Sequence, residues 1–205
     1  EYYNRDPYAL LYTSDLAFSS WGAFVQDEVR LSPRVLVNLG VRLDSYETFG
    51  ETVNPRLGVI LDPWPGTTLK LVCGTAFRAP NVGELFYQEG DDVRDVNPYL
   101  DAETITTYEA VWEQRLGTTV RTTLALYRNE VSDIIELSPD ADGSDTYYHV
   151  NLGDATATGG EVEVELGLPN GVRGRASYAY AEVEAAGWTG PFDNSPEHLG
   201  KLNLL

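Results

Sequence analysis

Few residues of this 205-residue sequence have the types and spacing that catalysis requires. The two histidines, His149 and His198, are far apart in the sequence, and neither belongs to a recognisable nucleophile motif. Carboxylates are abundant, so pairs such as Glu161 and Glu163 are expected by chance, and without a cleft or a perturbed pKa they indicate no acid–base chemistry. The sequence therefore predicts a protein that is not an enzyme and that needs no cofactor.

Two acidic segments have residue types that attract cations. "DADGSD", residues 140–145, has acidic and glycine residues spaced as in part of a calcium loop, but it lacks the bidentate glutamate that such a loop requires. We interpret it as an acidic hairpin tip and expect no metal site there. "QEGDDVRD", residues 88–95, is similarly acidic, and it either attracts a cation or a basic ligand or serves solubility alone.

The composition restricts the partners and the compartment. A formal net charge of −18 argues against nucleic acid as a partner, because a polyanion is repelled by an acidic protein. The single Cys73 forms no internal disulfide. Methionine is absent and the first residues do not resemble a secretion signal, which indicates a processed product or an excerpt of a longer chain. No run approaches the roughly 18 apolar residues of a membrane-spanning helix, although a spanning strand needs only about 9–11 residues, every second one apolar.

The elements that position these residues have a period of two. In "RVLVNLGVRLDS", residues 34–45, every second residue from Val35 to Leu43 is aliphatic, and the alternate positions are mostly polar or glycine. About nine such runs occur, and none has an apolar stripe of helical period. The predicted fold class is all-β, an antiparallel meander of about nine strands.

The connections between these runs alternate between short and long. Tight turns rich in Pro, Gly and Asn are expected near Pro33, Pro63, Gly117 and Asn170. Longer polar loops are expected at residues 46–54, 79–103, 137–147 and 187–197. A soluble sandwich has no reason to sort its loops by length, whereas an outer-membrane barrel has short periplasmic turns and long external loops. We therefore predict a partial wall of a transmembrane β-barrel, with the apolar face towards lipid.

Aromatic residues and charged residues support this assignment. The faces opposite the aliphatic ones carry long charged side chains mixed with glycines, as expected for a wet or plugged lumen. We expect several aromatic residues near strand ends to form interfacial girdles. They are Trp21, Trp64, Phe77, Trp112, Tyr178 and Tyr180.

"GTAFRAPNVGELFY", residues 74–87, closely resembles the "FRAP" stretch of TonB-dependent outer-membrane receptors, in which a strand ends and an extracellular loop begins. "WGAFVQDEVRLSPRVLVNLGVRLDSY" resembles the hairpin that family members carry upstream. "NPYLDAETITTYEAVWEQRLG", with its Tyr108–Glu109 pair, resembles the downstream segment, and "NSPEHLGKLNLL" resembles a later entry from loop to strand. The four pieces occur in the order that the family shows.

The resemblance implies a receptor in the outer membrane of a Gram-negative bacterium. Such receptors bind a scarce nutrient, commonly a ferric siderophore or cobalamin, and import it with energy delivered by the TonB protein. The expected partners are thus TonB, contacted through an N-terminal plug, a small nutrient ligand that can be an iron chelate, and outer-membrane lipid. Nothing here resembles the plug or the TonB box, and about nine strands cannot enclose a barrel of about 22. We expect residues 1–205 to be an internal section of the barrel, incomplete at both ends.

The resemblance also indicates where a ligand would bind. Gly74 and Ala76 are expected to face the lumen, and Phe77 the lipid. Pro80 ends the strand because it has no N–H to donate, and residues 81–103 form a loop in water. Arg78 either braces the base of this loop through a carboxylate, which is the favoured role, or touches the ligand. The ligand-binding candidates are Arg78, Tyr87, Asp91, Asp92 and Arg94.

Two other functions fit parts of the pattern. A passive, porin-like barrel would share the alternation but not the "FRAP" neighbourhood. A soluble all-β binding module would need its apolar faces turned inward against a second layer.

Overall fold

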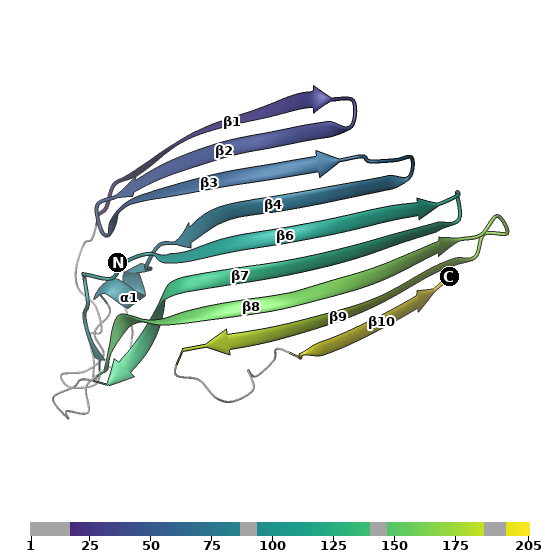
Figure 1. The fold of residues 1–205 in the computed structure, drawn as a ribbon. Helices are drawn as coiled ribbons and strands as arrows, with labels where there is room; N and C mark the ends of the chain where they lie inside the picture. The colour runs from purple at the N-terminus through teal and green to yellow at the C-terminus, as the bar shows by residue number, and fades with distance from the viewer. Residues whose placement is uncertain (1–16, 87–93, 140–146, 187–195) are drawn as a thin grey trace.

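The computed structural model describes residues 17–86, 94–139, 147–186 and 196–205. Nine strands form one antiparallel meander in chain order, which confirms the predicted fold class (Figure 1). The strands are β1 Ser20–Ser32, β2 Val35–Tyr46, β3 Gly50–Leu61, β4 Thr67–Arg78, β6 Glu103–Leu116, β7 Val120–Pro139, β8 Tyr147–Gly167, β9 Arg173–Ala185 and β10 His198–Leu204. A one-turn helix, α1 (Val82–Phe86), and a two-residue strand, β5 (Arg94–Asp95), lie between β4 and β6.

The two faces of the sheet differ in chemistry because side chains alternate along every strand. One register row of aliphatic and aromatic residues crosses seven of the strands, from β2 to β9, on what we call the apolar face. It consists of Val35, Leu61, Leu69, Trp112, Leu124, Val162 and Tyr178. The opposite, polar face carries most of the charged side chains of the strands.

No second layer covers the apolar face in the part of the chain that the structure describes. The buried hydrophobic residues among those described are Leu85, Leu100 and Ala102, and none of them belongs to a strand. By contrast, Leu71 on the apolar face is 47% exposed. A soluble sandwich would bury this face under another sheet. The arrangement is instead that of a wall whose apolar face requires lipid.

The predicted sorting of connections by end is confirmed where the structure describes them. The turns at Pro33, Pro63, Gly117 and Asn170 share one end of the sheet, here called the turn end (Figure 1). The other connections leave the opposite end, the loop end, although Asp91, Asp142 and Pro191 lie outside the described residues.

One predicted loop, at residues 46–54, is wrong. Residues 47–49 alone connect β2 to β3, because Gly50 has a φ of 94° and permits a tight turn. Beyond it Thr52 and Val53 pair with Asp44 and Leu43, so that the strands continue to the turn. The contrast between short and long connections therefore holds for the three other connections at the loop end.

The aromatic residues lie at strand ends only in part. Trp21 is the second residue of β1 and Phe77 the second-last residue of β4, as the girdle prediction requires. Trp112 and Tyr178, however, lie inside β6 and β9 and share one register row. The prediction is wrong for these two, because Trp112 and Tyr178 lie four and five residues from the nearer ends of their strands.

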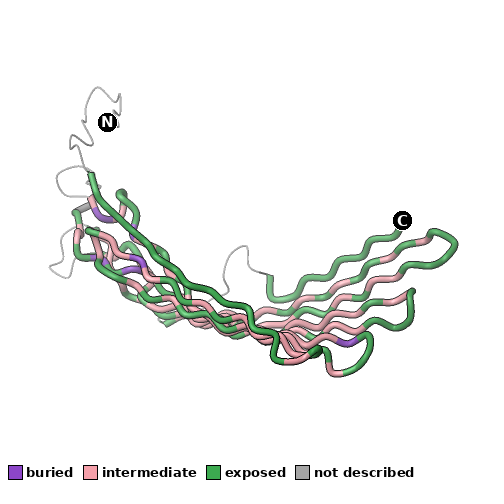
Figure 2. The backbone as a smooth tube through the Cα atoms, turned by 90° about the horizontal axis from the view of Figure 1, so that it is seen from above, coloured by how far each residue is buried: buried purple, intermediate pink, exposed green. Residues whose placement is uncertain are grey.

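The sheet is curved and open, as expected for part of a barrel wall (Figure 2). β1 and β10 are its edges. β7 and β8 have 20 and 21 residues, against 12 to 14 in β2, β3, β4 and β6, so their hairpin projects past its neighbours at the loop end. No helix in the described ranges is long and apolar enough to cross a membrane.

The ladder between β3 and β4 is shorter than the two strands. It runs from Leu61↔Leu69 to Arg56↔Gly74 and stops beside Pro55, which has no N–H to offer β4. Both strands continue towards the loop end, where the Phe49 and Phe77 rings lie 6.0 Å apart. We call this unpaired stretch the seam.

Candidate functional site

The loop that joins β4 to β6 begins at Arg78, the last residue of β4. The Arg78 guanidinium donates to both oxygens of Glu103, with Nε–Oε2 at 2.5 Å and Nη2–Oε1 at 2.6 Å. Its Nη1 donates to the two oxygens of Glu84 in α1, at 2.9 and 3.0 Å. The side chain thus occupies the bracing position that the sequence favoured for it.

Glu84 also explains why a helix turn forms directly after the proline. The Asn81 N–H donates to Glu84 Oε2 at 2.8 Å, and the Glu84 N–H donates to Asn81 Oδ1 at 2.9 Å. This reciprocal pair is a capping box, which satisfies backbone donors at the start of a helix. Leu85 is the buried residue of this turn, at 1% exposed. The sequence from Arg78 to Leu85 therefore encodes a strand end, a cap and a fixed helix turn.

Glu103 of β6 also bonds to β7 and so connects Arg78 to that strand. Its Oε1 accepts from the backbone N–H of Ile135 at 2.9 Å, next to the bulge at which Asp133 has a φ of 60°. Glu103 lies opposite Arg78, one position closer to the loop end than Phe77, the residue predicted for the aromatic girdle at that end. The hydrogen bonds from Arg78 lower the pKa of this carboxyl, against the opposing effect of its partial burial. One ion-paired cluster, Arg78, Glu84 and Glu103, thereby joins β4, α1, β6 and β7.

The second half of the loop is fixed to the projecting part of β8. β5 pairs in parallel with β8 through Arg94↔Tyr147 and Asp95↔Tyr148, where β9 no longer accompanies β8. Asn97 Nδ2 donates to the carbonyl of His149 at 2.8 Å. The loop therefore covers a strand edge that would otherwise present free backbone groups.

Asn151 of β8 completes this attachment. Its Oδ1 accepts from the Asp101 N–H at 2.9 Å, and its Nδ2 donates to the carbonyls of Asp101 and Asp133 at 3.1 and 2.7 Å. Tyr99, between these anchors, is 88% exposed. Residues 94–102, held by these hydrogen bonds, form what we call the ledge at the loop end. The ledge presents the aromatic side chain of Tyr99 to solvent.

The predicted ligand-binding residues are distributed along this loop. Arg78 is the last residue of β4, where the loop begins. Arg94 lies in β5, which pairs with the first residues of β8. Tyr87, Asp91 and Asp92 lie outside the described residues, between α1 and β5. Sequence reasoning missed Asn97, Asn151 and Tyr99. The Asn97–Pro98 pair is a turn signal that was available, whereas nothing in the sequence pairs Asn151 with Asp101.

Comparison with known proteins agrees with this architecture. The chain matches the family described as TonB dependent receptor-like, beta-barrel over residues 1–205. The iron-regulated outer membrane virulence protein of Vibrio cholerae is 26% identical over 204 aligned residues, which cover 91% of this chain and 31% of the relative. The vitamin B12 transporter BtuB of Vibrio vulnificus is 27% identical over 129 residues, which cover 63% of this chain and 20% of BtuB.

Solved structures share the fold. The siderophore receptor PirA from Pseudomonas aeruginosa superposes with a TM-score of 0.70 at 23% identity, over 81% of this chain and 32% of PirA. A variant of the ferric enterobactin receptor PfeA from the same bacterium, in complex with enterobactin, gives a TM-score of 0.69 at 22% identity, over 80% of this chain and 27% of PfeA. The chain spans less than a third of each of these proteins. The chain belongs to the family of TonB-dependent receptors of the bacterial outer membrane, and the part of those receptors that it matches is the β-barrel domain.

Proposed function

We propose that the chain is an internal section of the barrel wall of a receptor that imports a scarce nutrient across the outer membrane by TonB-coupled transport. The observation that carries this proposal is the family match over residues 1–205. The uncovered apolar face supports it, because a wall in lipid needs such a face. The function is transport without catalysis, and the TonB protein contacts a part of the receptor outside these residues.

The proposed substrate class is a ferric siderophore, with cobalamin as the alternative. The V. cholerae relative, which aligns with 91% of this chain, is named as iron-regulated. BtuB, which aligns with 63% of this chain, is named as a vitamin B12 transporter. The ledge between α1 and β8 supports an external binding site, because binding residues concentrate on loops held by a rigid scaffold. We assign ligand contact to the candidates Tyr87, Asp91, Asp92 and Arg94, with Arg78 holding the base.

Uptake by the full-length receptor tests the proposal. The receptor is expressed in a Gram-negative strain that lacks its own siderophore and cobalamin receptors, with and without TonB. Accumulation of iron-55 from a panel of ferric siderophores, and of cobalt-57 cobalamin, is measured in the same cells. We expect accumulation of one substrate class that disappears without TonB. Accumulation that is equal with and without TonB would identify a passive, porin-like barrel instead.

A further inference from the structure

Asp27 of β1 is a charged residue in the aliphatic part of the apolar face. It lies opposite Leu39, and the same register line continues to Leu57. Its neighbours on this face of β1 are Val25 and Val29, which are 65% and 37% exposed. A carboxylate that faces lipid is costly, and an ionisable residue within the membrane commonly marks a functional site.

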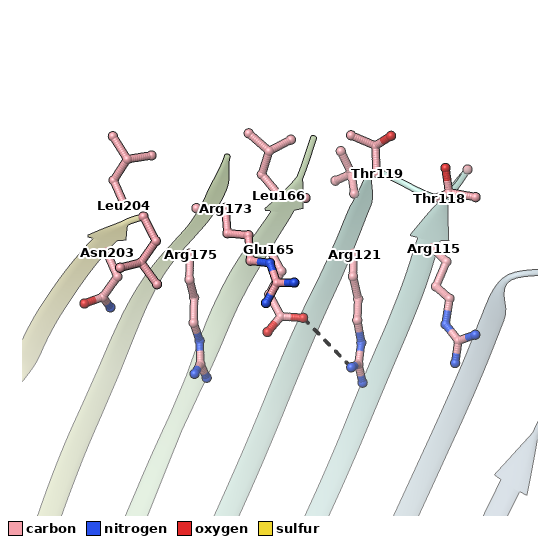
Figure 3. Close-up of a pocket in the computed structure, with 15 residues that line it drawn as sticks. Arg115, Thr118, Thr119, Arg121, Glu165, Leu166, Arg173, Arg175, Asn203 and Leu204 are labelled. Atoms are coloured by element: carbon pink, nitrogen blue, oxygen red, sulfur yellow. Dashed lines mark ion pairs between the residues drawn. The ribbon is translucent and has the colours of Figure 1, made fainter. Parts of the chain in front are cut away.

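No cation of the described wall neutralises Asp27. Its Oδ1 accepts from the N–H of Glu28 at 2.9 Å, and the carboxylate forms no ion pair with a described residue. In strand order, the first described cation on the apolar face is Arg128 of β7, which is itself in an ion pair and lies five strand spacings, or about 24 Å, away. The arginines at the turn end, such as Arg121 at 3.9 Å from Glu165, belong to the polar face (Figure 3).

A hollow of about 480 Å³ opens beside Asp27 on the apolar face. Aliphatic side chains line it, among them Val25, Val41 and Leu57. Arg56 also borders the hollow, but its register places it on the polar face. Of the described apolar-face residues around the hollow, Asp27 alone is charged. The volume is that of a pocket for a small ligand, and the lining suits an apolar body with one cationic group.

The height of Asp27 within the membrane indicates where that cation comes from. Trp21, which the sequence predicts for the girdle at the loop end, lies six residues before Asp27 on β1. Six residues of a tilted strand span about 15 Å of height, in an apolar band about 25 Å tall. Asp27 therefore lies in the half of the band nearer the turn end, which is the leaflet on the periplasmic side.

A lipid fits this place better than a second protein. The outside of a barrel is convex, so another protein would touch it along a narrow strip, whereas stable protein interfaces bury about 1,200–2,000 Å². Aspartate is too short to reach the headgroup level, in contrast to Lys or Arg, so the cation must come to it. Headgroups and water are drawn towards a charge that lies within a bilayer. Ethanolamine phospholipids combine a primary ammonium with two acyl chains.

We propose that Asp27 and the hollow beside it bind an ethanolamine phospholipid of the periplasmic leaflet. The lipid ammonium pairs with the Asp27 carboxylate, and an acyl chain fills the hollow between β1 and β4. The site is on the outside of the barrel. It requires that the chain lie in the outer membrane, and it does not depend on which nutrient the receptor imports.

A carbodiimide that dissolves in the membrane tests this contact in the full-length receptor. The purified receptor is reconstituted in vesicles of phosphatidylethanolamine and phosphatidylglycerol with a trace of oleic acid, and dicyclohexylcarbodiimide is added. The reagent adds to a carboxyl group, and the primary amine of the lipid then forms an amide with that carboxyl while dicyclohexylurea leaves. Where no amine is in contact, the adduct rearranges to a stable N-acylurea. Mass spectrometry measures the ratio of amide to N-acylurea at Asp27, and oleic acid gives the ratio for random contact.

We expect the ratio to be about fivefold higher at Asp27 than for oleic acid, as for one ion pair. Phosphatidylcholine in place of phosphatidylethanolamine should give N-acylurea alone, because its quaternary ammonium has no N–H and forms no amide. Glu28 is the matched control, since it follows Asp27 directly but lies on the polar face opposite Asn38. It should carry no lipid amide.

Three results would overturn the proposal. A ratio at Asp27 no higher than that of oleic acid would identify an adventitious contact only. An amide between Asp27 and a lysine would identify a polypeptide as the counter-ion. An Asp27 that the reagent leaves unmodified would not be open to lipid. Heat-modifiable migration in gels verifies that the receptor is folded, and these measurements need no substitution that could prevent folding.

Discussion

At the scale of single residues, the clearest constraint is the space beside Asp44, which is 2% exposed and paired with Arg42 at 2.7 Å. A Cβ at Gly22 would lie 2.6 Å from Asp44 Oδ1. Gly22→Ala is therefore expected to cost about 1–3 kcal/mol through overpacking. Gly200→Ala is the matched control, because a Cβ there meets nothing within 4 Å. Guanidinium unfolding of the full-length receptor compares them, and equal midpoints would contradict the prediction.

Arg78→Ala should loosen the loop without unfolding the barrel. The side chain is 44% exposed, so we expect a loss of only about 1 kcal/mol, which is roughly a fivefold rise in local hydrogen exchange over residues 81–86 and 94–102. Arg128→Ala, which removes one exposed pair with Glu130, should leave these segments unchanged. Unaltered exchange after Arg78→Ala would show that the other anchors hold the loop alone.

The same cluster has a defined response to pH. The pKa of Glu103 is lowered in the folded protein, so its pairing contributes fully above the usual value of about 4.5. The contribution is lost as the pH falls from there through the lowered pKa. Exchange over residues 94–102, corrected for the intrinsic effect of pH, should therefore be constant near neutrality and rise only in acid. In the Arg78→Ala protein this acid-dependent rise should be smaller.

At the scale of elements, the attachment of the loop to β8 depends on Asn151. Asn151→Ala removes three hydrogen bonds and leaves the Asp101 N–H without its partner, which we expect to cost about 1–3 kcal/mol locally. The protection of the Asp101 amide and of residues 133–135 should fall, while that of α1 is retained. Asn54→Ala, which breaks only a bond to Thr52, is the control. If the protection of α1 from hydrogen exchange also fell, the loop would be one cooperative unit.

The orientation of β4 gives a second prediction for an element. Leu71 is on the apolar face, and Lys70 is on the polar face bonded to Glu113. In the full-length receptor, Leu71→Arg should cost about 2–4 kcal/mol if the residue lies near the bilayer midplane, and Lys70→Ala much less. Cys73, on the Leu71 face, should react with a membrane-dissolved thiol reagent and resist a charged aqueous one. Rapid labelling by the charged reagent in intact membranes would reverse the assignment of the faces.

The strands were predictable and the loop contacts were not, for a physical reason. The alternation of apolar and polar residues along a strand follows from which side chains meet lipid. Residues such as Val37 and Leu39 therefore show directly which face of the strand is apolar. The "FRAP" stretch located the strand end at Arg78, and Pro80 explained it. Partners such as Glu103 and Asn151 depend on long-range contacts that leave no local pattern. The sequence does not predict the tight turn at Gly50, because the polar residues around it are equally typical of a longer loop.

At the scale of the whole molecule, the open edges at β1 and β10 determine what residues 1–205 do alone. In lipid each unpaired N–H or C=O costs several kcal/mol, so only a closed barrel is tolerated. We expect this segment by itself neither to insert stably nor to conduct or transport. Reconstitution into vesicles and planar bilayers measures both properties. A heat-resistant monomer with defined conductance would show that the chain closes into a small barrel.

The seam between β3 and β4 has a mechanical consequence for such a barrel. Strand number and register set the circumference of a closed barrel, and a fully paired wall fixes it along the whole height. Here the backbone pairing stops at Arg56↔Gly74, and the Phe49 and Phe77 rings span the remaining distance. Rings slide against each other more easily than ladder hydrogen bonds stretch. We therefore expect the outer mouth of a closed barrel to change its width at this line more easily than the rim at the turn end.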